Sequence, residues 1–320
     1  MQRYVLRRLA YLPLIVVAVS AITFFALRAP WARDPIVAMT GQNATNDAAL
    51  QEEQRLRESL NLDEPVLEQF GIWLGQIVRG DLGTTYRGRQ PVAHEVWERL
   101  PATVEILVLS IAFSSVLGVT FGVISAARQD TPIDYFVRFF AVFGQSIPDF
   151  FLLTLLIVLP SLWWNYSPPI GGHVDFFDHP LENLRLYLPP TLVLAVGGSA
   201  AVMRVTRSTM LEVLRQDYIR TAEAKGLGRR TVLLRHGFRN ALVPIITILG
   251  SYLTVLFFGA LILELLFSIN GLGQFFFTSV LLSDFPVVQF LVLYTAVVIV
   301  VLNLLIDLSY AFIDPRVQYR

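Results

Sequence analysis

Six long apolar runs constrain the fold of this chain more than any other feature. A helix needs about 20 apolar residues to cross the hydrocarbon core of a bilayer, and each run is close to that length with at most one charged residue. Lipid offers no partner for an unpaired backbone amide, so each run is expected to be a helix. The runs are Leu9–Leu27, Ala102–Ala126, Phe139–Leu159, Tyr187–Met203, Ala241–Leu266 and Val287–Leu308. The sequence therefore predicts an all-α integral membrane protein with six transmembrane helices, in which residues 1–320 form a single transmembrane domain.

Composition agrees with a membrane protein and excludes several other classes. Hydrophobic residues make up 54% of the chain, against about 45–50% in soluble domains. The formal net charge is zero, which gives no electrostatic basis for a nucleic-acid partner. No cysteine is present, so disulfides and thiolate metal sites are excluded. We expect the lipid bilayer to surround most of the chain.

The distribution of basic residues predicts which helix ends face the cytoplasm, because loops rich in Lys and Arg stay inside. With both termini in the cytoplasm, the inside segments hold sixteen of the 25 basic residues. The two short outside loops, 161–186 and 267–286, hold only Arg185. The opposite orientation would place the nine basic residues of 204–240 outside. We therefore predict cytoplasmic N- and C-termini.

The polar region 28–101, between the first two runs, is predicted to be an extracytoplasmic loop with helices of its own. Asp47–Leu60 has the pattern of an amphipathic helix. Pro65 is suited to opening a second helix, since proline fits the first helical turn, and Gly80–Gly83 would end it. The expected apolar face of this second helix contains Val66, Phe70, Trp73, Leu74 and Ile77.

The segment 204–240 is strongly basic and lies between two apolar runs. Good helix formers in Thr221–Lys225 predict a short helix. Gly226 predicts its end, because glycine adopts the left-handed conformation without strain. A second helical pattern begins near Thr231 and runs toward Pro244. A short helix, a glycine break and a second helix between membrane spans would form an exposed projection suited to docking on another protein.

The same segment carries a specific pattern, in which Arg220-Thr221-Ala222-x-Ala224-Lys225-Gly226 is followed by His236, Asn240 and Pro244. This pattern resembles the coupling-helix signature of ABC-importer permeases, and more narrowly that of the B-type permease of the dipeptide/oligopeptide/nickel group. The general importer signature has Glu-Ala-Ala where this chain has Arg220-Thr221-Ala222, and the missing glutamate suits the peptide subgroup. The resemblance assigns contact with the ATPase to Arg220, Thr221, Ala222, Glu223, Ala224, Lys225, Gly226, His236 and Asn240.

Motifs elsewhere are similar to the same group and extend the resemblance over nearly the whole chain. They are Gly80-Asp81-Leu82-Gly83 with Pro91-Val92 before the second run, Glu264 with Phe267 and Gly271-Leu272-Gly273 after the fifth, and Asn303, Asp307, Tyr310 and Asp314-Pro315-Arg316 at the C-terminal end.

The resemblance implies a permease subunit that forms half of a translocation path in a bacterial cell (inner) membrane. Its implied partners are a second homologous permease subunit, two cytoplasmic ABC ATPase subunits and an extracytoplasmic solute-binding protein. The implied cargo is a di- or oligopeptide, with nickel or an oligosaccharide as the alternative. A channel or a secondary transporter fits less well, because no convincing pore loop or inverted repeat is evident in the sequence.

Nucleotide chemistry is not expected in this chain. A phosphate-cradling loop needs Gly-Lys followed by Ser or Thr, whereas the only lysine, Lys225, lies between Ala224 and Gly226. No Ser-His-Asp or His-Glu-x-x-His arrangement is present. We therefore predict that the chain is not an enzyme and holds no cofactor, with ATP and Mg²⁺ bound by the partner ATPase subunits.

Asp149 is the most unusual residue inside a predicted span, since it follows Pro148 about halfway along Phe139–Leu159. Proline removes a helical hydrogen bond and kinks the helix. A carboxylate at the bilayer centre costs about 2.5–3.5 kcal/mol on insertion scales, so it normally faces a bundle interior or a wet path. We predict that Pro148 and Asp149 line the substrate path. The alternative is that Asp149 pairs with an amide or an arginine on a neighbouring helix.

The remaining polar residues give weaker predictions. Glu105, Glu264 and Asp307 lie near the ends of spans, and Asp307 is expected to pair with an arginine. The outer loop contains His173, Asp175, Asp178 and His179. Imidazole and carboxylate groups suit zinc or nickel, but this spacing matches no known metal motif, and we predict no metal site.

Overall fold

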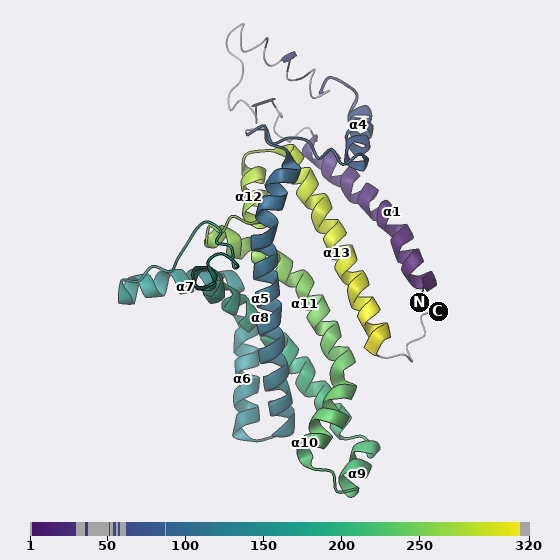
Figure 1. Cartoon of the computed structure of the whole chain (residues 1–320), viewed down its shortest axis with the longest axis vertical. Coiled ribbons are helices and arrows are strands. Elements are labelled where there is room, and N and C mark those ends of the chain that lie inside the picture. Colours follow the sequence, from purple (N-terminus) through teal and green to yellow (C-terminus); the bar gives the residue numbers. More distant parts are fainter. Residues whose placement is uncertain are drawn as a thin grey trace. The chain divides into compact units, whose positions relative to one another are not determined.

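The computed structural model describes residues 2–29, 36–37, 51, 54–55, 57, 62–86 and 88–313, and most of these residues are helical (Figure 1). No strand is formed in the described ranges, where pairing is limited to isolated bridges between Thr84 and Pro91 and between Gly172 and Ile269. The helices are α1 (Gln2–Leu27), α4 (Val66–Val78), α5 (Val92–Ala127), α6 (Pro132–Ser146), α7 (Asp149–Trp164), α8 (Pro180–Leu214), α9 (Asp217–Ala224), α10 (Arg229–Thr231), the π-helix η1 (Val232–Phe238), α11 (Arg239–Leu266), α12 (Leu272–Leu281) and α13 (Phe285–Ile313). The predicted all-α class is confirmed.

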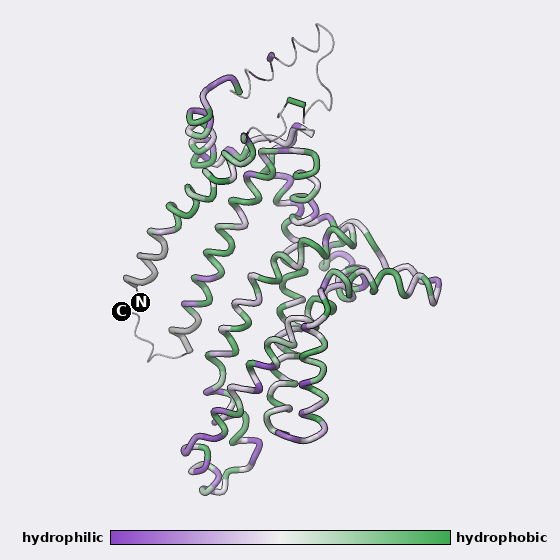
Figure 2. The backbone as a smooth tube through the Cα atoms, turned by 180° about the vertical axis from the view of Figure 1, so that it is seen from behind, coloured by the Kyte–Doolittle hydropathy of each residue, from purple (hydrophilic) through white to green (hydrophobic). Residues whose placement is uncertain are grey.

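Five helical stretches are long and apolar enough to cross a membrane, and α6 with α7 makes a sixth if the pair counts as one span. The five are Ala10–Leu27, Val92–Ala127, Pro180–Leu214, Arg229–Leu266 and Phe285–Leu308. Figure 2 shows hydrophobic residues predominating along these helices and hydrophilic ones in the connection around α9. The prediction of six spans is confirmed when α6 and α7 are counted together as one span. Several of the spans are longer than the apolar runs from which they were predicted.

The third span differs in shape from the predicted kinked helix, because α6 and α7 are bent by 92° at their junction. Ile147 is extended, with φ −105° and ψ 125°, and Pro148 precedes the first residue of α7. A residue before proline avoids the α region, and proline itself has no N–H to donate. The two effects together end one helix and begin another, so the span is broken at Ile147 and Pro148.

Contacts divide the chain into two compact units, and α5 and α13 each run from one unit into the other. The first unit contains 102–270 and the chain from Leu302 onward. At its centre α8 packs against α6 and α11. The largest core lies among α5, α7, α8 and α11 and consists of Ala102, Ile106, Leu153, Leu186, Tyr187, Leu194, Leu256, Ala260, Leu263, Phe267 and Ile269. On α5, a Cβ on Gly118 or Gly122 would come within 2.6 Å of Val202 or Thr206. Small residues here therefore let two membrane helices approach closely.

The second unit contains residues up to Pro101 together with 271–301. Its core consists of Val92, Val96, Leu272, Val287 and Leu291. The predicted helix after Pro65 is confirmed as α4, which packs the rings of Phe70 and Trp73 against Phe24 of α1. The predicted helix Asp47–Leu60 lies for the most part outside the described residues, as does Asp314-Pro315-Arg316.

Candidate functional site

The connection between α8 and α11 contains the break expected from its sequence. Helix α9 covers Asp217–Ala224, four residues longer at its start than the predicted Thr221–Lys225. Gly226 has φ +78°, and a Cβ added to it would meet nothing within 4 Å. The glycine is therefore needed for its backbone conformation and not for space. The second helix begins at Arg229, close to the predicted Thr231.

One face of α9 holds this connection against the first unit. Ile219, Ala222 and Val232 are buried together, and Leu214 at the end of α8 packs against them. Apolar burial of this kind is non-directional and scales with area, so it fixes the short helix without using its polar groups. Ala222, one of the residues assigned to ATPase contact, is thus an anchor of α9.

The other assigned residues of α9 and its end point outward. Arg220, Thr221, Glu223, Ala224, Lys225 and Gly226 are all exposed. Arg220 lies 3.7 Å from Asp217 in an ion pair whose side chains are 76% and 96% exposed. Exposed ion pairs contribute little to stability, so this face is available for contact with another protein. We call residues 217–228 the coupling segment.

His236 lies in η1 and Asn240 in the first turn of α11, close to where the two helices join. The side-chain amide of Asn240 donates to the carbonyl of His236 at 2.7 Å and to the hydroxyl of Tyr218 at 3.1 Å. Tyr218 belongs to α9, so Asn240 joins the coupling segment to the fifth span. The seven-residue π-helix between them is a feature that the sequence did not predict. Such wide turns are often found at functional positions.

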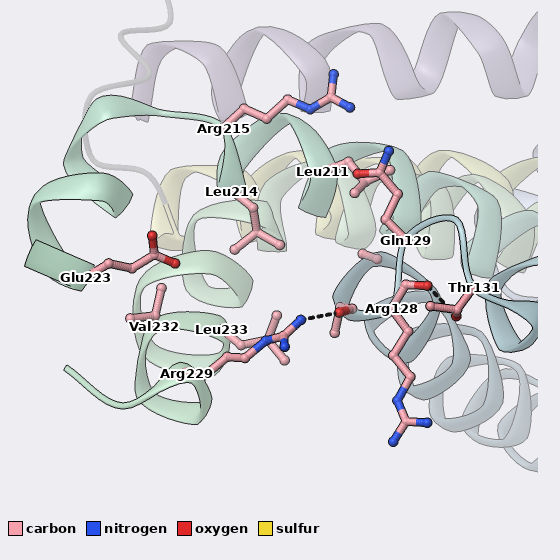
Figure 3. Close-up of a pocket in the computed structure, with 12 residues that line it drawn as sticks. Arg128, Gln129, Thr131, Leu211, Leu214, Arg215, Glu223, Arg229, Val232 and Leu233 are labelled. Carbon is pink, nitrogen blue, oxygen red and sulfur yellow. Dashed lines mark hydrogen bonds between the residues drawn. The ribbon is translucent and has the colours of Figure 1, made fainter. Parts of the chain in front are cut away.

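A pocket of about 490 Å³ lies beside the coupling segment (Figure 3). Its lining includes Arg128 after α5, Arg215 at the end of α8, Glu223 of α9 and Arg229 of α10. The guanidinium of Arg229 donates to the carbonyl of Ala127, the last residue of α5, at 2.7 Å. A cation at a helix C-terminus is favoured by the helix dipole, so Arg229, the residue directly after the coupling segment, attaches the start of α10 to the end of α5.

Asp149 begins α7 and lies against the middle of α8. A Cβ built on Gly197 would be 2.7 Å from Oδ1 of Asp149. The neighbouring Gly198 is covered by the ring of Tyr252, whose hydroxyl donates to the carbonyl of Leu194 at 2.8 Å. Within the described part of the chain, no side chain forms an ion pair or hydrogen bond with the Asp149 carboxylate. The structure therefore offers no amide or arginine partner there for the alternative role.

Glu264, His173 and Asp175, which were also singled out in the sequence, have hydrogen-bond partners within the chain. Thr103 donates to the carboxylate of Glu264 at 2.6 Å, and Nδ1 of His173 lies 2.6 Å from the hydroxyl of Tyr187. Asp175 accepts the amide of Phe177 at 2.7 Å. Over the described ranges, no group of three His, Cys, Asp or Glu side chains could hold a metal ion.

Sequence reasoning missed one buried ion pair. Asp134 at the start of α6 has a fully buried side chain and is paired with Arg207 of α8. Arg207 lies four residues beyond the predicted span Tyr187–Met203, and Asp134 lies just before Phe139–Leu159. Charged residues just outside an apolar run are expected to be in contact with water. Only the structure, in which the helices continue beyond the apolar runs, shows that Asp134 and Arg207 are packed between helices.

The fold and the exposed coupling segment together define a class, namely multi-span helical membrane proteins with a projection suited to a soluble partner. Comparison with known proteins identifies the family. The chain belongs to the inner membrane components of binding-protein-dependent transport systems, whose family model matches residues 118–319. The model of the N-terminal part of such membrane components matches residues 1–107.

Relatives of known name match over the full length of the chain. The dipeptide transport system permease protein DppB of Escherichia coli is 34% identical over 343 residues, and the oligopeptide transport system permease protein AppB of Bacillus subtilis is 35% identical over 325, with 100% of both chains covered in each case. The fold also resembles a crystal structure of an amino acid ABC transporter with histidines, with a TM-score of 0.54 and 15% identity over 69% of this chain and 94% of the other.

Membership of this family fixes the general role of the chain. It is the multi-span membrane component of an ABC transport system and not the part that hydrolyses ATP. A binding-protein-dependent system of this class implies a partnership with an ATPase and a binding protein.

Proposed function

We propose that this chain is a permease subunit of an ATP-driven importer of di- or oligopeptides. The relatives named as dipeptide and oligopeptide permeases support this cargo, because they match the chain from end to end. In this proposal the chain forms half of the translocation path and pairs with a second homologous permease subunit. Two cytoplasmic ATPase subunits bind ATP and Mg²⁺, and an extracytoplasmic binding protein delivers the cargo.

The observation that carries the proposal is the exposed coupling segment between the fourth and fifth spans. Its outer face presents Arg220, Thr221, Glu223 and Lys225, while Ile219 and Ala222 hold it to the first unit. A rigidly attached helix with an exposed polar face can receive force from a soluble partner. In the proposal, ATP binding draws the two coupling helices of the heterodimer together and opens the path outward, and hydrolysis resets it.

Pro148 and Asp149 are proposed to line the path. Asp149 stands at the break between α6 and α7, half-buried over Gly197. A carboxylate without a protein partner at membrane depth is favoured only beside water or an opposite charge. The amino terminus of a peptide supplies that charge, and a weak site lets the peptide leave again.

Reconstitution of the complete importer in proteoliposomes tests the proposal. We expect ATP-dependent uptake of a labelled dipeptide that requires the binding protein. Gly226→Val places a β-branched residue at φ +78°, a conformation it resists. We expect this variant to assemble, with uptake reduced by about tenfold or more if docking is lost. Undiminished uptake would contradict the coupling role, and ATP-driven uptake of nickel or an oligosaccharide in place of the dipeptide would correct the cargo.

The proposed orientation has a separate test. With both termini cytoplasmic, reporter fusions at Arg128, Arg229 and the C-terminus should report the cytoplasm. Fusions near Gly83, Gly172 and Gly273 should report the outside. A consistent reversal of fusions beyond any one span would contradict this topology.

A further inference from the structure

The buried carboxylate of Asp134 has four partners within the first unit, and the most distant of them is Arg138 of the same helix, at 3.6 Å. Arg207 donates from Nε to Oδ1 at 2.7 Å and from Nη2 to Oδ2 at 2.8 Å. Ser125 donates its hydroxyl to Oδ1 at 2.5 Å, and the backbone amide of Asp130 donates to Oδ2 at 3.0 Å. The planar guanidinium in a two-bond arrangement fixes orientation as well as distance. Asp134 therefore resists both separation from α8 and rotation against it.

These contacts join three elements next to the coupling segment. Ser125 lies in the last turn of α5, Asp130 in the α5–α6 turn, and Arg207 seven residues before the end of α8. Helix α9 begins three residues after that end. On its other side, Arg229 is hydrogen-bonded to the carbonyl of Ala127. The α5–α6 turn is thus held by two arginines whose segments flank α9 in the sequence.

The contacts at the opposite end of α6 are of a different kind. There, a Cβ on Gly144 would lie 3.5 Å from Val196 and 3.6 Å from Ala200 of α8. Ala141 of α6 is buried with Ala200 in the same region, and apolar packing is non-directional, so it fixes the orientation of α6 against α8 less strictly than a two-bond ion pair does. About 18 Å of helix separates Asp134 from Ser146 at a rise of 1.5 Å per residue. A displacement imposed at the ionic end would therefore be carried along α6 to the break before Asp149.

We propose that Asp134 and Arg207 are a positioning pair, which makes α6 follow α8 when the coupling segment moves and so transmits that movement to the α6–α7 break. Neither residue touches the cargo or the ATPase in this inference. The inference rests on the proposed coupling function, since it needs the coupling segment to be the part that moves. A purely stabilising ion pair would affect only the stability of the protein, whereas this pair is expected to affect the movement at the α6–α7 break as well.

A cysteine at the end of α6 can report that movement, because the chain has no cysteine of its own. Ser146 is exposed in the chain taken alone and lies beside the broken part of the third span, so we expect Ser146→Cys to be reached by a water-soluble maleimide through the path. In the complete importer in proteoliposomes, we expect its labelling rate to differ by about fivefold or more between the nucleotide-free and ATP-bound states. Adding Asp134→Asn should reduce this difference to less than about twofold, while ATP hydrolysis per complex stays within about twofold of its original rate.

A milder variant keeps the test decisive if Asp134→Asn fails to assemble. Ser125→Ala removes one neutral donor and retains the ion pair, so we expect assembly to survive and the labelling difference to fall by about half. The matched control is Glu98→Gln, which removes a carboxylate from an exposed pair with His94 and should leave the labelling difference unchanged.

Three outcomes would overturn the inference. The first is a state-dependent labelling difference that survives both Asp134→Asn and Ser125→Ala. The second is a parent protein whose Ser146→Cys reacts equally in all nucleotide states. The third is a parallel loss of hydrolysis and labelling difference in both variants, which would make the pair structural only. Gly226→Val separates this inference from the coupling function: if that variant transports normally, the coupling role itself fails.

Discussion

Two aspartates stand at opposite ends of α6, and their surroundings are opposite as well. Asp134, in the first turn, accepts hydrogen bonds from Arg207, Ser125 and the amide of Asp130. Asp149, just beyond the last turn, rests against Gly197 and has no such donor among the described residues. A buried carboxylate with every oxygen satisfied holds helices together. A half-buried one without partners is free to interact with something that is not part of the chain.

The stability of the complex should separate the two residues most clearly. Arg207→Met leaves the Asp134 charge buried without its main partner, and we expect a loss of about 3–5 kcal/mol in the free energy of unfolding. Asp149→Asn should change it by less than about 1 kcal/mol, because no internal bond is lost. Thermal unfolding of the purified complex measures both. Glu98→Gln, in an exposed pair with His94, is the control and should have no measurable effect; equal losses in all three would refute the distinction.

Neighbouring glycines of α8 offer a second way to sharpen the comparison. A Cβ on Gly198 would overlap the ring of Tyr252, whereas a Cβ on Gly197 would press on the Asp149 carboxylate. We expect Gly198→Ala to destabilise by about 1–3 kcal/mol through overpacking. Gly197→Ala should change the melting temperature little, because a half-buried carboxylate can move, but should lower dipeptide uptake. Uptake and melting temperature are measured on both variants. If Gly197→Ala lowered the melting temperature as much as Gly198→Ala does, the distinction between the two glycines would be wrong.

Asp149→Asn tests the second aspartate directly. The substitution keeps size and hydrogen bonding but removes the charge, so we expect uptake of a zwitterionic dipeptide to fall by about fivefold with assembly intact. Thiol labelling of Asp149→Cys provides the check on accessibility. Protection from a water-soluble reagent in every nucleotide state would rule out a position on the path.

The last comparison concerns the end of α9, where two glycines differ in conformation. Gly226 has φ +78°, whereas Gly228 has φ −62° and ψ 143°, which any residue adopts. Gly226→Ala should cost about 1–2 kcal/mol for the left-handed conformation, and Gly228→Ala almost nothing. Their uptake rates should follow the same order. A larger loss at Gly228 would point to a contact with the ATPase in place of a backbone requirement.

The spans were predictable because long apolar runs leave the backbone no alternative to helix in lipid. The turn at Gly226 and the start of α4 after Pro65 were also predictable, because in each case the chemistry of a single residue decides the local structure. The bend at Pro148 was predicted in position but not in size. A proline reports a lost hydrogen bond, whereas the 92° angle depends on how α7 packs against α8 and α11.

The part of the candidate site that escaped prediction depends on contacts between distant segments. Asp134 and Arg207 are 73 residues apart, and the hydrogen bond from Arg229 to Ala127 spans 102. Residues such as these look like ordinary charges at the ends of spans. Their partners depend on which helices lie side by side, and a local sequence pattern does not show which helices are neighbours.

The π-helix that joins α10 to α11 has a consequence for how this connection can change in evolution or by design. Each of its turns closes one residue later than an α-helical turn, so the seven residues from Val232 to Phe238 hold the equivalent of an insertion. Deleting Leu234, which is exposed, would let the segment close as an ordinary α-helix. The chain before the deletion would then be turned by about 100° around the axis of the fifth span relative to α11, and the coupling segment would have to exchange its present packing against Leu214 for another. A permease with such a deletion would present a different face to its ATPase, so partner choice could be altered without changing any residue on the docking surface.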